Sequence, residues 1–469
     1  MPDANENTWR KKALGIVVAL VAYAILAGMP APEGLSPAGQ KSLALMVSAI
    51  IVWVSDALPL AMACSLFLFL QSVLGTANLS TALQRFAIPP VFFCFAMCCI
   101  VVAFQNSGLT RRIVLWTSLK SRGEPKRLLF LLMMVTALVS SILADVPVVA
   151  MMFPVALFLL QQNKCPVGES PFGKAVMLGI ALAALIGGVG TPAGSGTNIL
   201  TINMLENAAH VSVSFFQWTA IGMPMVLLLT PVAWWALIKV YPPEIQHLVG
   251  MESIGEDYAR LGPLGRKEKC FLLFLSINLL LWCSSGTHGL PLPTAAVLGC
   301  VLFALPGVGL ITWEEDRSKI GWDILFLVGT ANSLGMALWE NGTATWIANA
   351  CLGGLNTLPL IMVIALVSLF TILIHLVIPV NTPIVTVVLP PVVAIAVSMG
   401  INPAILAVPL GFSVSAAVLL PLDSVSLVTY QAGYYKMYDM FKPGIIISIA
   451  WIIITTALMY LIATPLGLM

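Results

Sequence analysis

The sequence predicts an all-α polytopic membrane protein, with eleven transmembrane helices and two re-entrant hairpins arranged in two inverted repeats. Three observations indicate this fold class. Hydrophobic residues make up 59% of the 469 residues and charged residues only 9%, whereas soluble domains carry about 25% charged residues. Apolar runs long enough to span a bilayer recur from end to end. Short motifs of the first half also recur, in the same order, in the second half.

The apolar runs predict the spanning helices, of which two are interrupted by polar segments rich in Gly, Pro and Ser. Their ranges are 13–29, 42–56, 58–75, 90–117, 172–209 (broken), 214–240, 268–284, 292–310, 322–353, 403–433 (broken) and 443–464. The first run is long and lacks a clear cleavage site after it, so we expect it to stay as a helix instead of being removed as a signal peptide.

Two further segments, 128–161 and 358–399, each consist of two apolar arms joined at a polar tip. The tips read Asp145-Val146-Pro147 and Asn381-Thr382-Pro383. The arms are marginal for a full crossing of about 20 residues, and no charged loop separates them. We therefore expect re-entrant hairpins, whose irregular backbone is tolerated at membrane depth only where protein buries it or where it lines a cavity.

Basic residues predict the orientation. Arg10, Lys11 and Lys12 precede the first span, and placing them in the cytoplasm leaves only Lys41 and Arg85 on the outer side. We therefore expect a multi-pass protein of the cell inner membrane, surrounded by lipid, with a cytoplasmic N-terminus. The small net charge of +2 gives no indication of nucleic-acid binding.

The internal repeat sets the domain organisation. The matched residues are Pro59 with Pro291, Gly108 with Gly342, Asp145 with Asn381, Pro147 with Pro383, Pro154 with Pro390, and Pro192 with Pro421. An odd number of crossings separates equivalent helices, so the two copies are predicted to be inverted. Inverted repeats with broken helices at matching positions are typical of secondary transporters, whose sites lie at the repeat interface.

Four predicted domains follow from this repeat. They are an N-terminal helix at 1–41, a first repeat at 42–240, a cytoplasmic linker at 241–267 and a second repeat at 268–469. The first repeat contains the hairpin 128–161 and the broken helix 172–209, and the second contains the hairpin 358–399 and the broken helix 403–433.

The four interruptions, at 144–147, 188–198, 380–383 and 420–426, are expected to meet near the midplane. Helix N-termini at such breaks favour an anion, whereas freed carbonyls and side-chain oxygens suit Na⁺. No Lys or Arg lies in these segments, so a bound anion would depend on helix ends, amides, hydroxyls and a co-bound cation. The polar side chains are Ser140, Asp145, Thr191, Ser195, Thr197, Asn198, Asn381, Thr382, Asp423, Ser424 and Ser426.

Three ionisable residues near the breaks have more than one interpretation. Asp145 is either a functional carboxylate at membrane depth or a cap for the arm that follows it. Asp423 is either part of the same site or a residue of a cytoplasm-facing loop. His375 either relays protons or packs as a core histidine.

The chain also resembles a known family over about residues 42–460. The motifs "VWVSDALPLAMACSL", "NSGLTRRIVL", "AMMFP", "GTPAGSGTNIL", "WDILFLVG" and "AGYYKMYDMFKPG" are similar to those of the divalent anion/sodium symporter family, which carries dicarboxylates, citrate and sulfate. The resemblance implies eleven helices, two hairpins, a homodimer built on a scaffold domain, and an elevator-type movement of the transport domain.

The resemblance also implies site residues, with departures. It implies a sodium site at Ser140, Asp145 and the Gly194 carbonyl, with Asn381 as a further cation-binding residue. The family's hairpin tips usually read Ser-Asn-Thr, and here the first reads Ala144-Asp145-Val146. At the family's second sodium site the matching positions are Leu376 and Val380, which offer no side-chain oxygen. The substrate-binding residues implied are Val146, Ser195, Thr197, Asn198, Asn381, Thr382, Asp423 and Ser424.

We therefore expect sodium-coupled import of a small organic anion, resembling a di- or tricarboxylate or a related oxyanion. Binding of Na⁺ first would neutralise Asp145 and admit the anion. The alternatives are a proton-coupled symporter or anion exchanger that uses Asp145, with H⁺ in place of Na⁺, and a cation/proton antiporter. No nucleophile–base pair or paired metal-ligand spacing is present, so we expect neither an enzyme nor catalytic residues.

Overall fold

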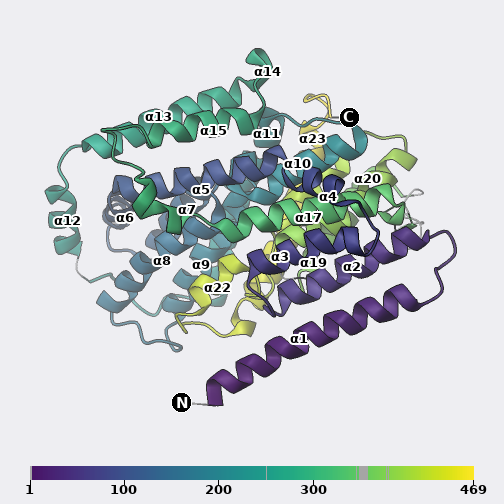
Figure 1. Cartoon of the computed structure of the whole chain (residues 1–469). Coiled ribbons are helices and arrows are strands. Elements are labelled where there is room, and N and C mark those ends of the chain that lie inside the picture. The colour runs from purple at the N-terminus through teal and green to yellow at the C-terminus, as the bar shows by residue number, and fades with distance from the viewer. Residues whose placement is uncertain are drawn as a thin grey trace.

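The computed structural model describes residues 3–249, 251–344, 346–347, 358–376, 378 and 380–468, and the regular elements in this part are all helices. The N-terminal part forms α1 (Asp3–Gly28), α2 (Pro37–Val54), α3 (Leu60–Val73), α4 (Leu79–Phe86), α5 (Pro89–Ser107) and α6 (Leu109–Lys120). Helices α1 and α2 pack together along one edge of the molecule (Figure 1).

The first half continues with the segments that carry the polar breaks. They are α7 (Pro125–Ser140), α8 (Asp145–Gln162), α9 (Pro171–Gly188), the 3₁₀ turn η1 (Pro192–Gly194), α10 (Gly196–Ala209) and α11 (Phe215–Val240). The α7–α8 pair is the segment predicted as the first hairpin. Helices α9 and α10 are the two parts of the predicted broken helix.

The rest of the chain begins with a helix of the predicted linker and continues to the C-terminal helix. Its elements are α12 (Met251–Arg260), α13 (Arg266–Cys283), α14 (Ser285–His288), α15 (Leu292–Phe303), α16 (Trp313–Asp316), η2 (Arg317–Lys319), α17 (Trp322–Glu340), α19 (Leu360–Ile374), α20 (Asn381–Ser398), α21 (Ala404–Val414), α22 (Ser424–Tyr430), η4 (Met437–Asp439) and α23 (Phe441–Ile462). Helices α13 and α15 pack together at the edge opposite α1 (Figure 1).

Within the described residues, seven helices are long and apolar enough to cross a membrane, or eight if the bent pair of 313–319 and 322–340 counts as one span. The second arms of both predicted hairpins, α8 and α20, are among them at 18 residues each. The chain is therefore an all-helical protein with several membrane spans. By length and composition, α8 and α20 each suffice for a crossing, although the sequence indicated arms of marginal length.

Several predicted helix boundaries differ from the structure, and the first helix begins at Asp3 where residue 13 was expected. The helix expected at 90–117 is two helices, because Gly108 adopts a left-handed φ of 85° between α5 and α6, a conformation that commonly ends helices. The helix expected at 292–310 ends at Phe303. The helix expected at 322–353 ends as α17 at Glu340, followed by Gly342 at φ 76°, and its predicted residues 345 and 348–353 lie outside the described residues.

Contacts between helices are paired across the two halves. Helix α3 packs on α17 and α15 packs on α5, while α8 contacts α22 and α20 contacts α10. Helix α7 packs on α9 in the first half, and α19 packs on α21 in the second. One cluster of buried apolar side chains joins elements of both halves, with Trp218, Trp282 and Trp451 among its largest members. The broken segments are thus enclosed by helices of both halves.

The linker is fixed to the first half through Arg112 on α6. Its Nε donates to Glu268 Oε1 at 2.7 Å, its Nη2 donates to Glu268 Oε2 at 3.1 Å, and its Nη1 donates to the Gly262 carbonyl at 2.9 Å. Both side chains are largely buried, with exposures of 15% and 10%. A two-pronged arrangement of this kind is among the stronger ion pairs in proteins.

We expect Arg112→Gln to lower the free energy of unfolding by about 2 kcal/mol, because hydrogen bonds to a charged group are lost and Glu268 stays buried. Thermal unfolding of the purified protein in detergent measures this. The matched control is Arg260→Gln, since Arg260 pairs with Glu256 on the exposed face of α12 and exposed pairs contribute little. Equal losses in the two variants would contradict the role given to Arg112.

Candidate functional site

The first hairpin tip places a buried carboxylate at the start of a helix. Helix α7 ends at Ser140, the chain turns, and α8 begins at Asp145, which is 7% exposed. Asp145 Oδ1 accepts a hydrogen bond from the Val146 amide at 2.9 Å, so the carboxylate does bond the helix start. A Cβ placed on Gly188 would lie 3.4 Å from Asp145 Oδ2. The second oxygen therefore faces the end of α9.

The break between α9 and α10 brings backbone carbonyls to the same place. A Cβ on Gly194 would lie 2.5 Å from the Gly188 carbonyl oxygen and 2.9 Å from the Ser140 carbonyl oxygen. The Gly194 carbonyl oxygen in turn lies within 3.6 Å of the Cβ position of Gly188. Four groups thus lie close to the two glycines, Gly188 and Gly194: the Asp145 carboxylate and the carbonyls of Ser140, Gly188 and Gly194. We call this set the first oxygen cluster.

Oxygen atoms alone make up this cluster, and this is the ligand type that hard cations prefer. The described residues contain no group of three or more His, Cys, Asp or Glu side chains that could hold a metal ion. The Ser140 hydroxyl donates to the Ala184 carbonyl at 2.8 Å, and its oxygen keeps lone pairs for a cation. The cluster therefore suits a monovalent cation held mainly by carbonyls and one carboxylate.

Asn198 offers the site a hydrogen-bond acceptor, whereas the sequence indicated a hydrogen-bond donor to an anion. Its Nδ2 donates to the Gly188 carbonyl at 2.7 Å and to the Thr191 carbonyl at 2.9 Å. Both amide hydrogens are therefore used. Its Oδ1 is buried and has no hydrogen-bond partner among the described residues, and a buried polar atom left without a partner indicates an absent ligand or water.

The remaining side chains of the first break are hydroxyls. Thr191 Oγ1 donates to the Ser141 carbonyl at 2.5 Å and accepts from the Ala193 amide at 3.1 Å. The Ser195 and Thr197 hydroxyls lie 3.0 Å apart. Since one of this pair donates to the other, the second keeps an O–H for a ligand. Both are buried, with 5% exposure.

The structure also shows a supporting residue that the sequence did not indicate. Trp218 Nε1, on α11, donates to the Val189 carbonyl at 3.0 Å, and the Trp218 ring is fully buried. Gly222, one turn later, lets α11 approach the same loop, because a Cβ there would lie 2.4 Å from the Val189 carbonyl oxygen. No sequence signal distinguishes this tryptophan from others in apolar helices.

The second half brings Asn381, Thr382 and Asp423 to its own breaks. Helix α20 begins at Asn381, whose Oδ1 lies 3.2 Å from His375 Nε2, and Thr382 is buried. Asp423 is the N-cap of α22 and accepts from the Val425 amide at 2.9 Å. It is 3% exposed. Ser424, in contrast, is exposed.

The two halves meet around the two acids. Helix α22, which follows Asp423, packs on α8, which begins at Asp145, and on α9. Neither acid takes part in any ion pair among the described residues. Two buried carboxylates without a compensating charge would repel an anion strongly, because screening in the interior is weak.

Comparison with known proteins gives consistent matches. The family described as the sodium:sulfate symporter transmembrane region matches residues 10–469. A membrane protein of Cupriavidus necator is 27% identical, covering 87% of this chain and 84% of that one. The sodium-dependent dicarboxylate transporter SdcS of Staphylococcus saprophyticus is 23% identical, covering 96% and 91%. A sodium-dependent high-affinity dicarboxylate transporter of Caenorhabditis elegans is 24% identical, covering 88% and 81%.

Two solved structures share the fold at low identity. The YdaH transporter of Alcanivorax borkumensis superposes with a TM-score of 0.56 at 15% identity, covering 82% of this chain and 87% of that one. MtrF of Neisseria gonorrhoeae superposes with a TM-score of 0.54 at 14% identity, covering 96% and 94%. Identity this low relates the architectures alone.

Proposed function

This chain belongs to the sodium:sulfate symporter family, and we propose that it imports a small organic anion together with Na⁺ across the inner membrane. As a member of that family it is a multi-pass secondary transporter and not an enzyme. We propose as substrate a di- or tricarboxylate or a related oxyanion. Relatives described as sodium-dependent dicarboxylate transporters support this choice of cation and substrate.

The first oxygen cluster is the observation that carries the proposal. Na⁺ bound between the Asp145 carboxylate and the carbonyls of Ser140, Gly188 and Gly194 would neutralise the acid at the tip. An anion could then approach without facing the Asp145 charge. We therefore propose an ordered cycle in which Na⁺ binds before the anion.

The donors left for an anion are few and lie at the breaks. Asn381 Oδ1 faces His375, which leaves the Asn381 amide nitrogen to donate to a carboxylate. One hydroxyl of the Ser195–Thr197 pair and the Thr382 hydroxyl are further donors. The free Oδ1 of Asn198 would accept from a hydroxyl group or a protonated carboxyl of the substrate. Val146, Asp423 and Ser424 complete the proposed lining.

We further propose the finer architecture that the sequence predicts. The paired contacts of α3 with α17 and α5 with α15, and of α8 with α22 and α10 with α20, support two inverted repeats at 42–240 and 268–469. The linker 241–267 would join them, after the N-terminal helix at 1–41. The same proposal includes eleven spans with two re-entrant hairpins and a cytoplasmic N-terminus. It also includes a homodimer and an elevator-type movement.

Uptake into liposomes tests the function. The purified protein is reconstituted and uptake of succinate, malate, citrate, sulfate, aspartate and taurine is measured with a Na⁺ gradient, with K⁺ in its place, and with a pH gradient alone. We expect Na⁺ to drive uptake of at least one carboxylate. Uptake that follows the pH gradient and is indifferent to Na⁺ would contradict sodium coupling.

A further inference from the structure

His375 occupies the centre of the second half's polar break. It follows α19 directly and is 5% exposed. Its Nε2 lies 2.8 Å from the Val414 carbonyl oxygen and 3.2 Å from Asn381 Oδ1. Its Nδ1 lies 2.9 Å from the Thr371 carbonyl oxygen, one turn earlier in α19. Both ring nitrogens thus face oxygen atoms, and the ring joins the hairpin to the broken helix.

These oxygens lie at the same helix ends as those of the first oxygen cluster. Asp145 is the first residue of α8, and Asn381 is the first residue of α20. Gly188 is the last residue of α9, and Val414 is the last residue of α21. In the first half, the tip side chain and the carbonyl at the helix end lie beside glycines. In the second half, the tip side chain and the carbonyl at the helix end both contact the His375 ring.

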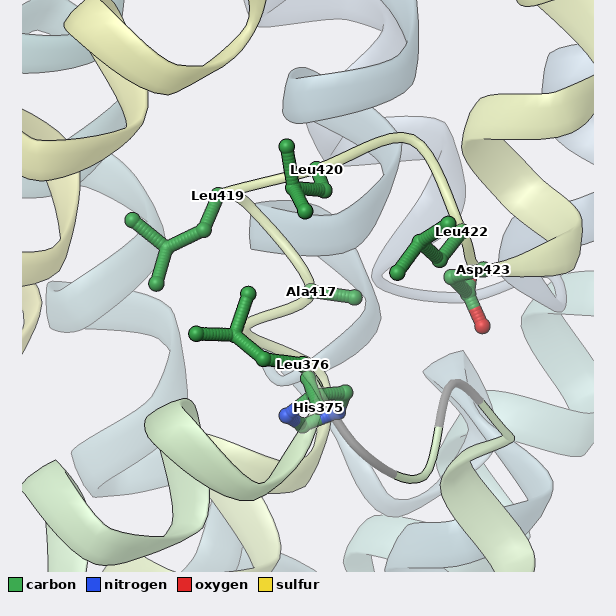
Figure 2. Close-up of a pocket in the computed structure, with 7 residues that line it drawn as sticks. All are labelled: His375, Leu376, Ala417, Leu419, Leu420, Leu422 and Asp423. Carbon is green, nitrogen blue, oxygen red and sulfur yellow. The ribbon is translucent and has the colours of Figure 1, made fainter. Parts of the chain in front are cut away.

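The space beside His375 offers little else to a cation. One cavity is lined by His375, Leu376, Ala417, Leu419, Leu420, Leu422 and Asp423. Figure 2 shows His375 and Leu376 on one side of this cavity, and the segment from Ala417 to Asp423 passing around the other. Apart from the ring and the Asp423 carboxylate, the lining side chains are apolar. Among these side chains, the Asp423 carboxylate alone offers oxygen ligands to a cation.

We propose that the His375 side chain fills the second-half position that corresponds to the cation position of the first half. In the tautomer with its hydrogen on Nε2, the ring donates to the Val414 carbonyl at 2.8 Å, with Asn381 Oδ1 at 3.2 Å beside the same hydrogen, so both oxygens face the ring in place of a cation. The protein then binds its coupling cation in the first half alone. This inference rests on the proposed sodium coupling, and it specifies how many cations each cycle needs.

The test is the Na⁺ dependence of uptake, measured at constant pH and saturating substrate, together with the reversal potential of coupled flux. The wild type is expected to show a Hill coefficient of about one, since this coefficient cannot exceed the number of sites. In His375→Ser the ring is removed and a hydroxyl is supplied, so the curve should become sigmoidal, with one more Na⁺ per substrate. His375→Gln, whose amide can donate in place of Nε2, should keep the wild-type shape.

Other results would overturn the inference in distinguishable ways. A wild-type Hill coefficient near two would show that His375 does not fill a cation position. A wild-type reversal potential that corresponds to two Na⁺ per substrate would show the same. An unchanged curve in a folded His375→Ser variant would show the same. Should that variant fail to fold, the wild-type reversal potential alone decides. A wild type with no Na⁺ dependence would contradict the proposed function, and this inference with it.

Discussion

Asp145→Asn is expected to raise the Na⁺ concentration for half-maximal uptake by about 10- to 100-fold, which corresponds to about 1.4–2.8 kcal/mol of cation binding. The substitution keeps the shape of the side chain but removes its negative charge. A carboxylate and a cation in contact interact by about 4 kcal/mol near a protein surface, so a loss of this size is reasonable. Uptake into liposomes over a range of Na⁺ concentrations measures it.

The same variant has a second expected property. Without the Asp145 carboxylate, the site repels an anion less in the absence of Na⁺, because Asp423 is then the one acid left there, so anion binding in K⁺ buffer should become stronger than in the wild type. The matched control is Asp257→Asn, on the outer helix α12, where the side chain is 44% exposed. Unchanged Na⁺ dependence in Asp145→Asn would remove Asp145 from the cation site.

Gly194→Ala is expected to abolish sodium-dependent uptake. The added Cβ would lie 2.5 Å from the Gly188 carbonyl oxygen and 2.9 Å from the Ser140 carbonyl oxygen, so both carbonyls must move. Overpacking of this kind typically costs about 1–3 kcal/mol of stability. The effect on cation binding should be larger, because the displaced atoms are the proposed ligands.

Two measurements separate these effects. Thermal unfolding in detergent is recorded for Gly194→Ala with and without Na⁺, and Gly28→Ala serves as the control because a Cβ there meets nothing within 4 Å. We expect a modest loss of stability in K⁺ and the loss of any stabilisation by Na⁺. A Gly194→Ala protein that Na⁺ stabilises as well as it does the wild type would contradict the cluster.

Patterns within single segments predicted much of the fold. The tips at Asp145 and Asn381 are the first residues of α8 and α20, and both predicted broken helices are interrupted. These breaks follow from local chemistry, because Gly and Pro interrupt apolar runs. The division at Gly108 was missed, since one glycine in a long apolar run is compatible with a continuous helix until its φ is known. The short helix α4 was missed as well.

The candidate site was harder to predict, because most of it is backbone. Sequence reasoning indicated Ser140 as a ligand but not that its backbone carbonyl would lie at the cluster, 2.9 Å from the Cβ position of Gly194. Gly188 contributes its backbone carbonyl, which every residue type carries, so the sequence does not mark it as a ligand. Asn198 was expected to donate to an anion, but its amide hydrogens are used within the loop. The contact of His375 with Val414 joins residues 39 positions apart, which no local pattern encodes.

The order of binding is the most direct test of the account. Isothermal titration of the purified wild type, with the anion that gives the largest uptake, is performed in Na⁺ buffer and in K⁺ buffer of equal ionic strength. We predict binding in Na⁺ and none measurable in K⁺, since the uncompensated Asp145 carboxylate then repels the anion. Equal affinity in the two buffers would contradict a cation-first mechanism at Asp145.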